Sequence, residues 1–215
     1  MSQGANALPK SEQLNIEAFS KLFTHTANSY KYLFFLALLN ILKQRNFDRA
    51  PIALQDLMVE MLVIAWQAYH PHRLSFGNKD MIAGRFDVFT EVGGNLSGEE
   101  LRKAISSKML STTKELKKFA PYRLIRPFFE MELKGVKSGE TNQNIAALSR
   151  DRFQDQKPLY SINDQNETIS LHPEWIEYLK TNNDAVCQWG FDAWLEYMQK
   201  CNSSIDNLSK KLAFV

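Results

Sequence analysis

The sequence predicts a mainly α protein: a multi-helix globular body with one small β-hairpin. Two observations favour helices, namely the long apolar stretches at residues 28–45 and 53–69. A third observation, two short β-prone runs around a polar turn at residues 159–172, predicts the hairpin. With 215 residues, of which 44% are hydrophobic, the chain is long enough to bury a sizeable core.

The N-terminal part begins with a polar segment, residues 1–13, which we expect to be a flexible tail. A short helix is predicted at 15–23 and the central helix at 28–45. The apolar run inside the central helix extends from Tyr32 to Leu42, about half of the roughly 20 residues that a membrane span needs. A helix that is apolar nearly all round and too short to span a bilayer is a core helix.

Further helices are predicted at 53–69, at 79–92 after a Gly-Asn turn, and at 97–119 after an acidic first turn. Residues 129–133 alternate between apolar and charged side chains, which indicates a half-buried strand. Residues 137–158 are polar and predict a loop.

The C-terminal part contains the hairpin and two helices, at 172–180 and 184–201. We therefore divide the chain into a helical core domain at 14–136, the loop at 137–158, and a hairpin with C-terminal helices at 159–215. Three tryptophans in the last part are expected to pack on the core: Trp175, Trp189 and Trp194.

The composition narrows the function classes only slightly. A formal net charge of +2 argues neither for nor against nucleic acid, so only local clustering of charge is informative. Cys187 and Cys201 are the only cysteines, too few for a disulfide framework, and the N-terminal residues lack a signal peptide's apolar region. We expect a cytoplasmic protein that does not enter the membrane.

Candidate catalytic and metal-binding patterns are weak. His70-Pro71-His72 brings two imidazoles together without a neighbouring cysteine or acidic cluster, so no metal site is predicted. Glu132 and Lys134 resemble the end of a restriction-nuclease pattern, in which an acid holds a divalent metal, with Asp87 as the upstream acid. The segment GGNLSG lacks the lysine of a phosphate-binding loop. No cofactor or small-molecule substrate is indicated.

A basic segment is the most informative feature. It has eight cationic side chains in about 25 residues, against the single acid Glu115. A row of lysines and arginines is typical of contact with a phosphate backbone, and the same row suits an acidic protein partner. The predicted binding residues are Arg102, Lys103, Lys108, Lys114, Lys117, Lys118, Arg123 and Arg126.

Four stretches in order resemble the N-terminal helical region of bacterial HNH-endonuclease-type proteins. HTANSYKYLFFLALLNIL is similar to an opening helix with TNSYKF, and LMVEMLVIAWQAYHPHRLSFGNKDMI to a helix followed by LSFGKQD. FAPYRLIRPFF is similar to VPYRFLSPFF, and WLEYMQKCNSSIDNLSKKL to WLEYLQKRNPNVPNISNKL. The likeness covers residues 24–212.

The nuclease part of that family, with its DHFLPW-like stretch, has no counterpart in this sequence. The resemblance therefore implies a non-catalytic protein, similar in style to small accessory subunits of SMC-type (Lamassu-like) defence systems. We expect an accessory, scaffolding subunit of an anti-phage or anti-plasmid complex. It would bridge a nuclease effector and an SMC-like ATPase, and DNA contact stays open.

Three alternatives remain at this point. The chain is the non-catalytic part of a longer HNH endonuclease, or it is a divergent metal-dependent nuclease that uses Glu132 and Lys134. The third alternative is a winged-helix-like DNA-binding regulator built on residues 28–70.

Overall fold

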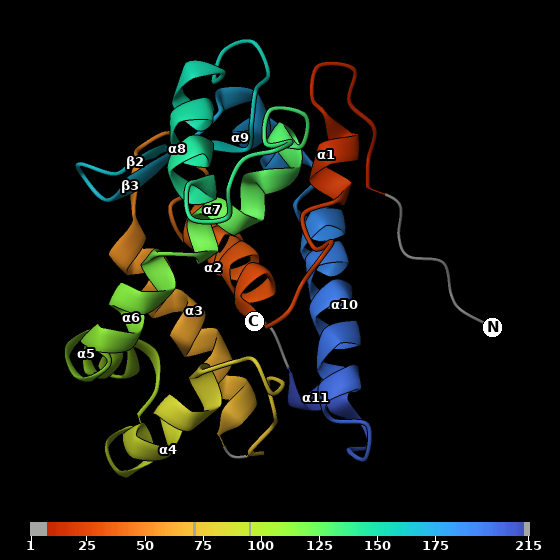
Figure 1. Ribbon diagram of the computed structural model, residues 1–215. Coiled ribbons are helices and arrows are strands. Elements are labelled where there is room, and N and C mark those ends of the chain that lie inside the picture. Colours follow the sequence, from red (N-terminus) through yellow and green to blue (C-terminus); the bar gives the residue numbers. More distant parts are fainter. Residues whose placement is uncertain (1–7, 71, 95, 213–215) are drawn as a thin grey trace.

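The computed structural model describes residues 8–70, 72–94 and 96–212. It confirms a mainly α protein with a small antiparallel sheet. Two long helices, α2 (Tyr30–Gln44) and α3 (Leu54–Tyr69), pack against each other at the centre (Figure 1). Most side chains of both helices are buried, as their nearly continuous apolar sequences require. None of the helices in the described ranges is both long and apolar enough to cross a bilayer.

The helix α10 (Asn183–Cys201) packs against α2 and runs beside it in Figure 1. Gly190 permits this close packing, because a Cβ atom there would lie 2.8 Å from Cε1 of Phe35 on α2. The short C-terminal helix α11 (Leu208–Lys211) contacts α10.

Aromatic rings join the two ends of the chain. Phe19, on the short helix α1 (Ile16–Ser20), stacks on Trp175 with ring centroids 4.7 Å apart. Its ring also stacks on Trp189, at 5.4 Å. Trp175 belongs to α9 (Pro173–Thr181), so this aromatic cluster holds the N-terminal helix against the C-terminal helices.

Three helices cover α3 on the side away from α10: α4 (Ile82–Gly93), α5 (Gly98–Lys108) and α6 (Leu110–Lys117). The sequence predicted α5 and α6 as a single helix. The structure breaks that helix at Met109, whose backbone leaves the helical region at φ −109° and ψ 27°. Because of this break, both α5 and α6 contact α3.

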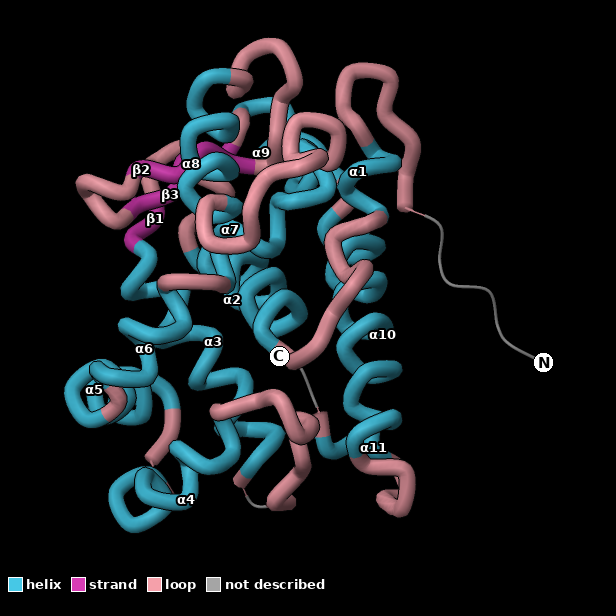
Figure 2. Tube along the Cα trace, in the orientation of Figure 1, coloured by secondary structure: helices cyan, strands magenta, loops and turns pink. Residues whose placement is uncertain are grey.

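The predicted hairpin is confirmed: β2 (Tyr160–Asn163) pairs antiparallel with β3 (Thr168–Leu171). A third strand, β1 (Ile52–Ala53), pairs with the other edge of β3 and was not predicted. Figure 2 shows this sheet in magenta at one side of the helical body. Ile52 lies opposite Ile169, so a buried apolar pair fixes the register of the added strand.

The strand predicted at residues 129–133 is wrong. The chain there continues from α7 (Ala120–Ile125) into a 3₁₀ helix, η1 (Arg126–Phe129), followed by a turn. The amide of Leu133 donates a hydrogen bond to the carbonyl of Phe129, at 3.0 Å. Both side chains are therefore buried one helical turn apart, while Met131 is 71% exposed. The apolar residues have a helical period, and the short alternation was accidental.

The polar loop predicted at residues 137–158 is also wrong over half of its length, because α8 (Thr141–Asp151) lies there. The buried side chains of this helix include Ile145 and Ser149, one turn apart. The Ser149 hydroxyl accepts a hydrogen bond from the amide of Ile162, at 3.0 Å, and so fastens α8 to β2. A narrow stripe of small and polar buried residues gives too weak an apolar pattern to reveal such a helix.

Candidate functional site

Two of the eight predicted binding residues have structural partners. Arg102 grips the buried carboxylate of Glu60, with Nε 3.0 Å from Oε2 and Nη2 3.2 Å from Oε1. Glu60 also accepts a hydrogen bond from Asn40 on α2. Lys117 forms an ion pair of 2.7 Å with Glu167, and its side chain is only 13% exposed. Because carboxylates already match their charges, a structural role explains these two cations without a ligand.

Four others, Lys103, Lys108, Lys114 and Lys118, are exposed on α5 and at α6. None of the four lines the cleft that holds the remaining two residues. A solvated helix face explains them without a ligand.

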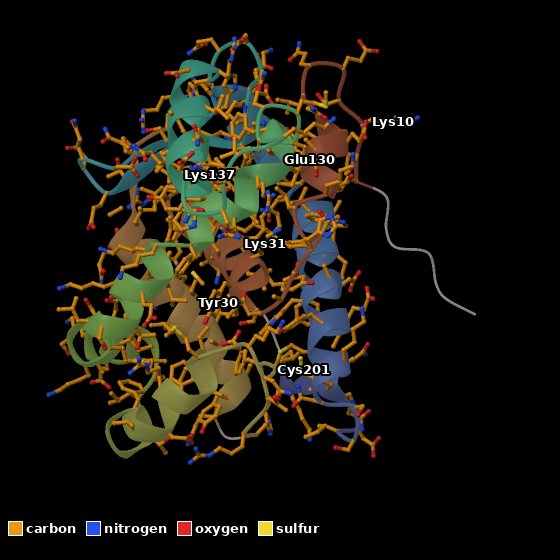
Figure 3. All side chains as sticks on the ribbon, in the orientation of Figure 1. Lys10, Tyr30, Lys31, Glu130, Lys137 and Cys201 are labelled. Carbon is orange, nitrogen blue, oxygen red and sulfur yellow. The ribbon has the colours of Figure 1, made fainter. Side chains whose placement is uncertain are left out.

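Arg123 and Arg126 line a cleft of about 840 Å³. Its walls come from three stretches of chain: residues 24–31, which lead into α2, residues 79–81 before α4, and residues 115–134 around α7 and η1. In Figure 3 the labelled Tyr30, Lys31 and Glu130, all of which line the cleft, follow one another through the centre of the view. The site thus lies where the N-terminus of the central helix meets the end of the basic segment.

The cationic side chains that line the cleft outnumber the carboxylates five to two, a formal excess of three positive charges. One carboxylate, Glu115, already pairs with Arg85 at 3.7 Å. In the described part of the chain, none of the five cations forms an ion pair. The five are Lys31, Lys79, Arg123, Arg126 and Lys134.

Arg123 carries the clearest sign of an absent partner. Its Nε is buried and has no hydrogen-bond partner among the described residues. A buried donor without a partner costs free energy, typically about 1–3 kcal/mol. Such a cost is compensated when a ligand supplies the acceptor.

Lys31 is held in an environment that disfavours its charge. Burial and then the neighbouring Arg126 and Arg123 together lower its pKa to about 8, while Glu130 acts in the opposite direction. Lys31 also lies in the first turn of α2, where the helix dipole repels a cation. Its ammonium group donates one hydrogen bond, to the carbonyl of Thr24 at 2.8 Å. An anion in the cleft would offset the repulsion between Lys31 and the two arginines.

Asp80 fixes one wall of the cleft to another. Its Oδ2 accepts hydrogen bonds from the amide and the hydroxyl of Ser29, at 2.9 and 2.6 Å. Its Oδ1 accepts from the amide of Ile82, at 2.9 Å. The Tyr30 hydroxyl accepts from the amide of Met81, at 3.2 Å. Burial raises the pKa of Asp80, against these hydrogen bonds. A polar network therefore joins two of the three walls, and these two are preformed.

The other sequence-predicted candidates are dispersed. His70 stacks on Trp66 with ring planes 3° apart. Asp87 pairs with Arg73 on the surface, while Glu132 accepts a hydrogen bond from Gln156. Among the described residues, no three or more His, Cys, Asp or Glu side chains are placed to hold a metal ion. Because Glu132 and Lys134 lie in a turn, they lack the strand that the nuclease pattern requires.

The winged-helix alternative also loses its structural basis. It requires an exposed helix that can enter a DNA groove. The two helices of residues 28–70 are α2 and α3, which are buried on most sides by one another and by their neighbours. Neither has a free face for DNA.

Sequence reasoning predicted two of the five cleft cations as binding residues; it named Lys134 only for a nuclease pattern and missed Lys31 and Lys79. These come from other segments, and helical spacing rules do not indicate which distant segments meet. No spacing pattern in the sequence links Lys31 or Lys79 to the two arginines. Comparison of the chain with protein-family models, with curated proteins and with solved structures gave no significant match.

Proposed function

We propose that this chain is a non-catalytic accessory subunit of a cytoplasmic bacterial defence complex against phages or plasmids, and that it contacts nucleic acid through the cleft. The observation that carries the nucleic-acid part is the set of five unpaired cations around one cavity. Elsewhere on the surface most arginines pair with carboxylates, as they do in ordinary solvated faces.

The chemistry of the cleft suits phosphate better than an acidic protein segment. A guanidinium group presents a planar fork of donors that matches phosphate oxygens, and two such groups lie near the ammonium group of Lys31. The preformed walls suit a compact anion that enters the cavity. We expect the flexible carboxylate side chains of an acidic protein to pair instead with the exposed lysines outside the cleft.

The defence role and its partners rest on the resemblance of four ordered stretches to HNH-type proteins. In this proposal the chain supplies a binding surface and a scaffold, while a nuclease effector cuts and an SMC-like ATPase moves or loads DNA. Genes for such an ATPase and nuclease beside this one would support the assignment. A neighbourhood without either would count against it.

The nucleic-acid part is tested by measuring the affinity of the purified protein for single-stranded and duplex DNA between about 50 and 200 mM salt. We expect the affinity to fall steeply with salt. The variant Arg126→Gln is expected to weaken binding and to lower the salt slope by roughly one. Arg49→Gln is the matched control, because Arg49 is an exposed arginine outside the cleft.

Two outcomes would contradict the proposal. One is the absence of binding at the lowest salt concentration. The other is binding of polyglutamate as tightly as DNA of similar charge, which would indicate an acidic protein as the partner.

A further inference from the structure

The cleft has the volume of a small-molecule site. Its volume of about 840 Å³ falls in the range of roughly 300–1,000 Å³ that is usual for pockets that enclose cofactors and similar ligands. A lone inorganic anion would leave most of that space empty. A duplex presents its phosphates on a wide, rigid surface, which suits the partly buried Lys31 and Arg123 less well than a single flexible unit does.

One part of the lining is apolar, and it includes an exposed aromatic ring. Phe119 is 42% exposed, although large apolar side chains elsewhere in the fold are mostly buried. It lines the same cleft as the cations, and its neighbours there include Leu133 and Pro127. An exposed aromatic ring beside phosphate-binding cations is the usual combination in sites for unpaired nucleotides, because every base has a flat face that stacks on the ring.

We infer that the cleft takes one unpaired nucleotide unit, with its phosphate among Lys31, Arg123 and Arg126 and its base against the ring of Phe119. This inference rests on the proposed nucleic-acid contact and makes it specific. The ligand is the end of a single strand or a free nucleotide, since both carry the same base and phosphate. A base inside a duplex is excluded, because its faces are covered by neighbouring bases.

The orphaned donor of Arg123 and the disfavoured charge of Lys31 both favour a phosphate at this end of the cleft. A terminal phosphate suits the site best, because it carries more charge and more free oxygens than a phosphodiester. We therefore expect a 5′-phosphorylated end to bind more tightly than a 5′-hydroxyl end of the same strand.

The test uses the full chain and fluorescence anisotropy of tetrathymidylate labelled at its 3′ end, with and without a 5′-phosphate. Thymidine monophosphate, thymidine and inorganic phosphate serve as competitors. We expect the phosphorylated strand to bind more tightly, and the monophosphate to compete better than either thymidine or phosphate alone. Competition by the monophosphate at concentrations similar to the strand identifies a free nucleotide as the ligand. Much weaker competition identifies a strand end.

Two variants separate the base from the phosphate. Phe119→Ala is expected to weaken the binding of both ligands by roughly tenfold, the loss of one stacked base. Leu110→Ala is its matched control, because Leu110 is similarly exposed, at 46%, and lies outside the cleft. Arg126→Gln is expected to abolish the preference for the 5′-phosphate. Arg126 is exposed, so this change leaves the core intact.

The outcomes distinguish this inference from the broader proposal. If duplex DNA binds with a steep salt dependence, but the 5′-phosphate has no effect and Phe119→Ala behaves like Leu110→Ala, the nucleotide site is overturned and nucleic-acid contact stands. If neither a strand, a duplex nor thymidine monophosphate binds at low salt, both are overturned. If the phosphorylated strand binds and both cleft variants act as expected, both stand.

Discussion

The close contact between α10 and α2 gives the sharpest prediction for stability. Replacing Gly190 by alanine would place a Cβ atom 2.8 Å from Cε1 and 2.9 Å from Cδ1 of Phe35. Carbon atoms prefer a separation of about 3.5–4.0 Å, so the ring or the helix must move by more than half an ångström. The ring has little room to do so, because it is fully buried and packs edge-on against Phe19, Phe23 and Trp189.

The magnitude follows from two opposing terms. Alanine is better than glycine inside a helix by about 1 kcal/mol. Overpacking a well-filled core costs roughly 1–3 kcal/mol, and more when the obstacle is rigid. Because the Phe35 ring has little room to move, we take the upper part of that range, about 2–3 kcal/mol, so that Gly190→Ala lowers the free energy of unfolding by about 1–2 kcal/mol. For a chain of this length that corresponds to a fall in Tm of roughly 2–8 °C.

Gly84→Ala is the matched control. Gly84 also lies within a helix, α4, but a Cβ atom there would meet no other atom within 4 Å. Only the propensity term applies, so this variant should be more stable than the parent by up to about 1 kcal/mol. Thermal and urea unfolding of both variants checks the pair. If Gly190→Ala stabilised the protein as much as Gly84→Ala, the close packing of α10 on α2 would be refuted.

Three further predictions concern charged groups. Arg102→Leu should lower the free energy of unfolding by about 3 kcal/mol, because it leaves the buried Glu60 carboxylate without its partner. Adding Glu60→Leu should restore much of that loss, which a double-mutant cycle measured by urea unfolding would show. In the cleft, Lys31 lies near the two arginines and Glu130, and DNA binding should weaken as pH rises through about 8, because the Lys31 ammonium group loses its proton. In anisotropy titrations, Lys31→Met should bind DNA weakly and show no such pH dependence. His172 is buried, its Nδ1 caps α9, and burial lowers its pKa. Stability should therefore fall as pH drops below about 6.5, because the unfolded chain takes up the proton first. In Tm measurements, His172→Asn should lose this dependence.

The sequence was sufficient to predict the elements whose signal is strong and local. The central helices α2 and α3 are apolar on nearly all sides over many residues, and the β2–β3 hairpin has turn residues at its tip. It failed where the signal was short or diluted. Phe129 and Leu133 fit both a strand and a helical turn, and only packing decides between them.

The candidate site shows the same limit more strongly. A row of basic residues along the chain suggested one surface, yet tertiary structure divides it. Arg102 pairs with a buried carboxylate, whereas Arg123 lines the cleft. Lys31 lines the same cleft, near Arg123 and Arg126, although it lies far from both in the sequence. Ion pairing of a lysine or arginine depends on whether a carboxylate lies near it in the folded protein. The sequence alone does not give those positions.

The stacking of Phe19 on Trp175 and Trp189 has a consequence for biosynthesis. The rings that enclose Phe19 are made long after it, so a nascent chain on the ribosome carries the apolar α2 and its aromatic neighbours without their cover. The central helix α2 is fully covered only once α10 has left the ribosomal exit tunnel. Complete burial of the central helix therefore waits for the C-terminal helices, and until then the growing chain exposes apolar surface that chaperones can shield.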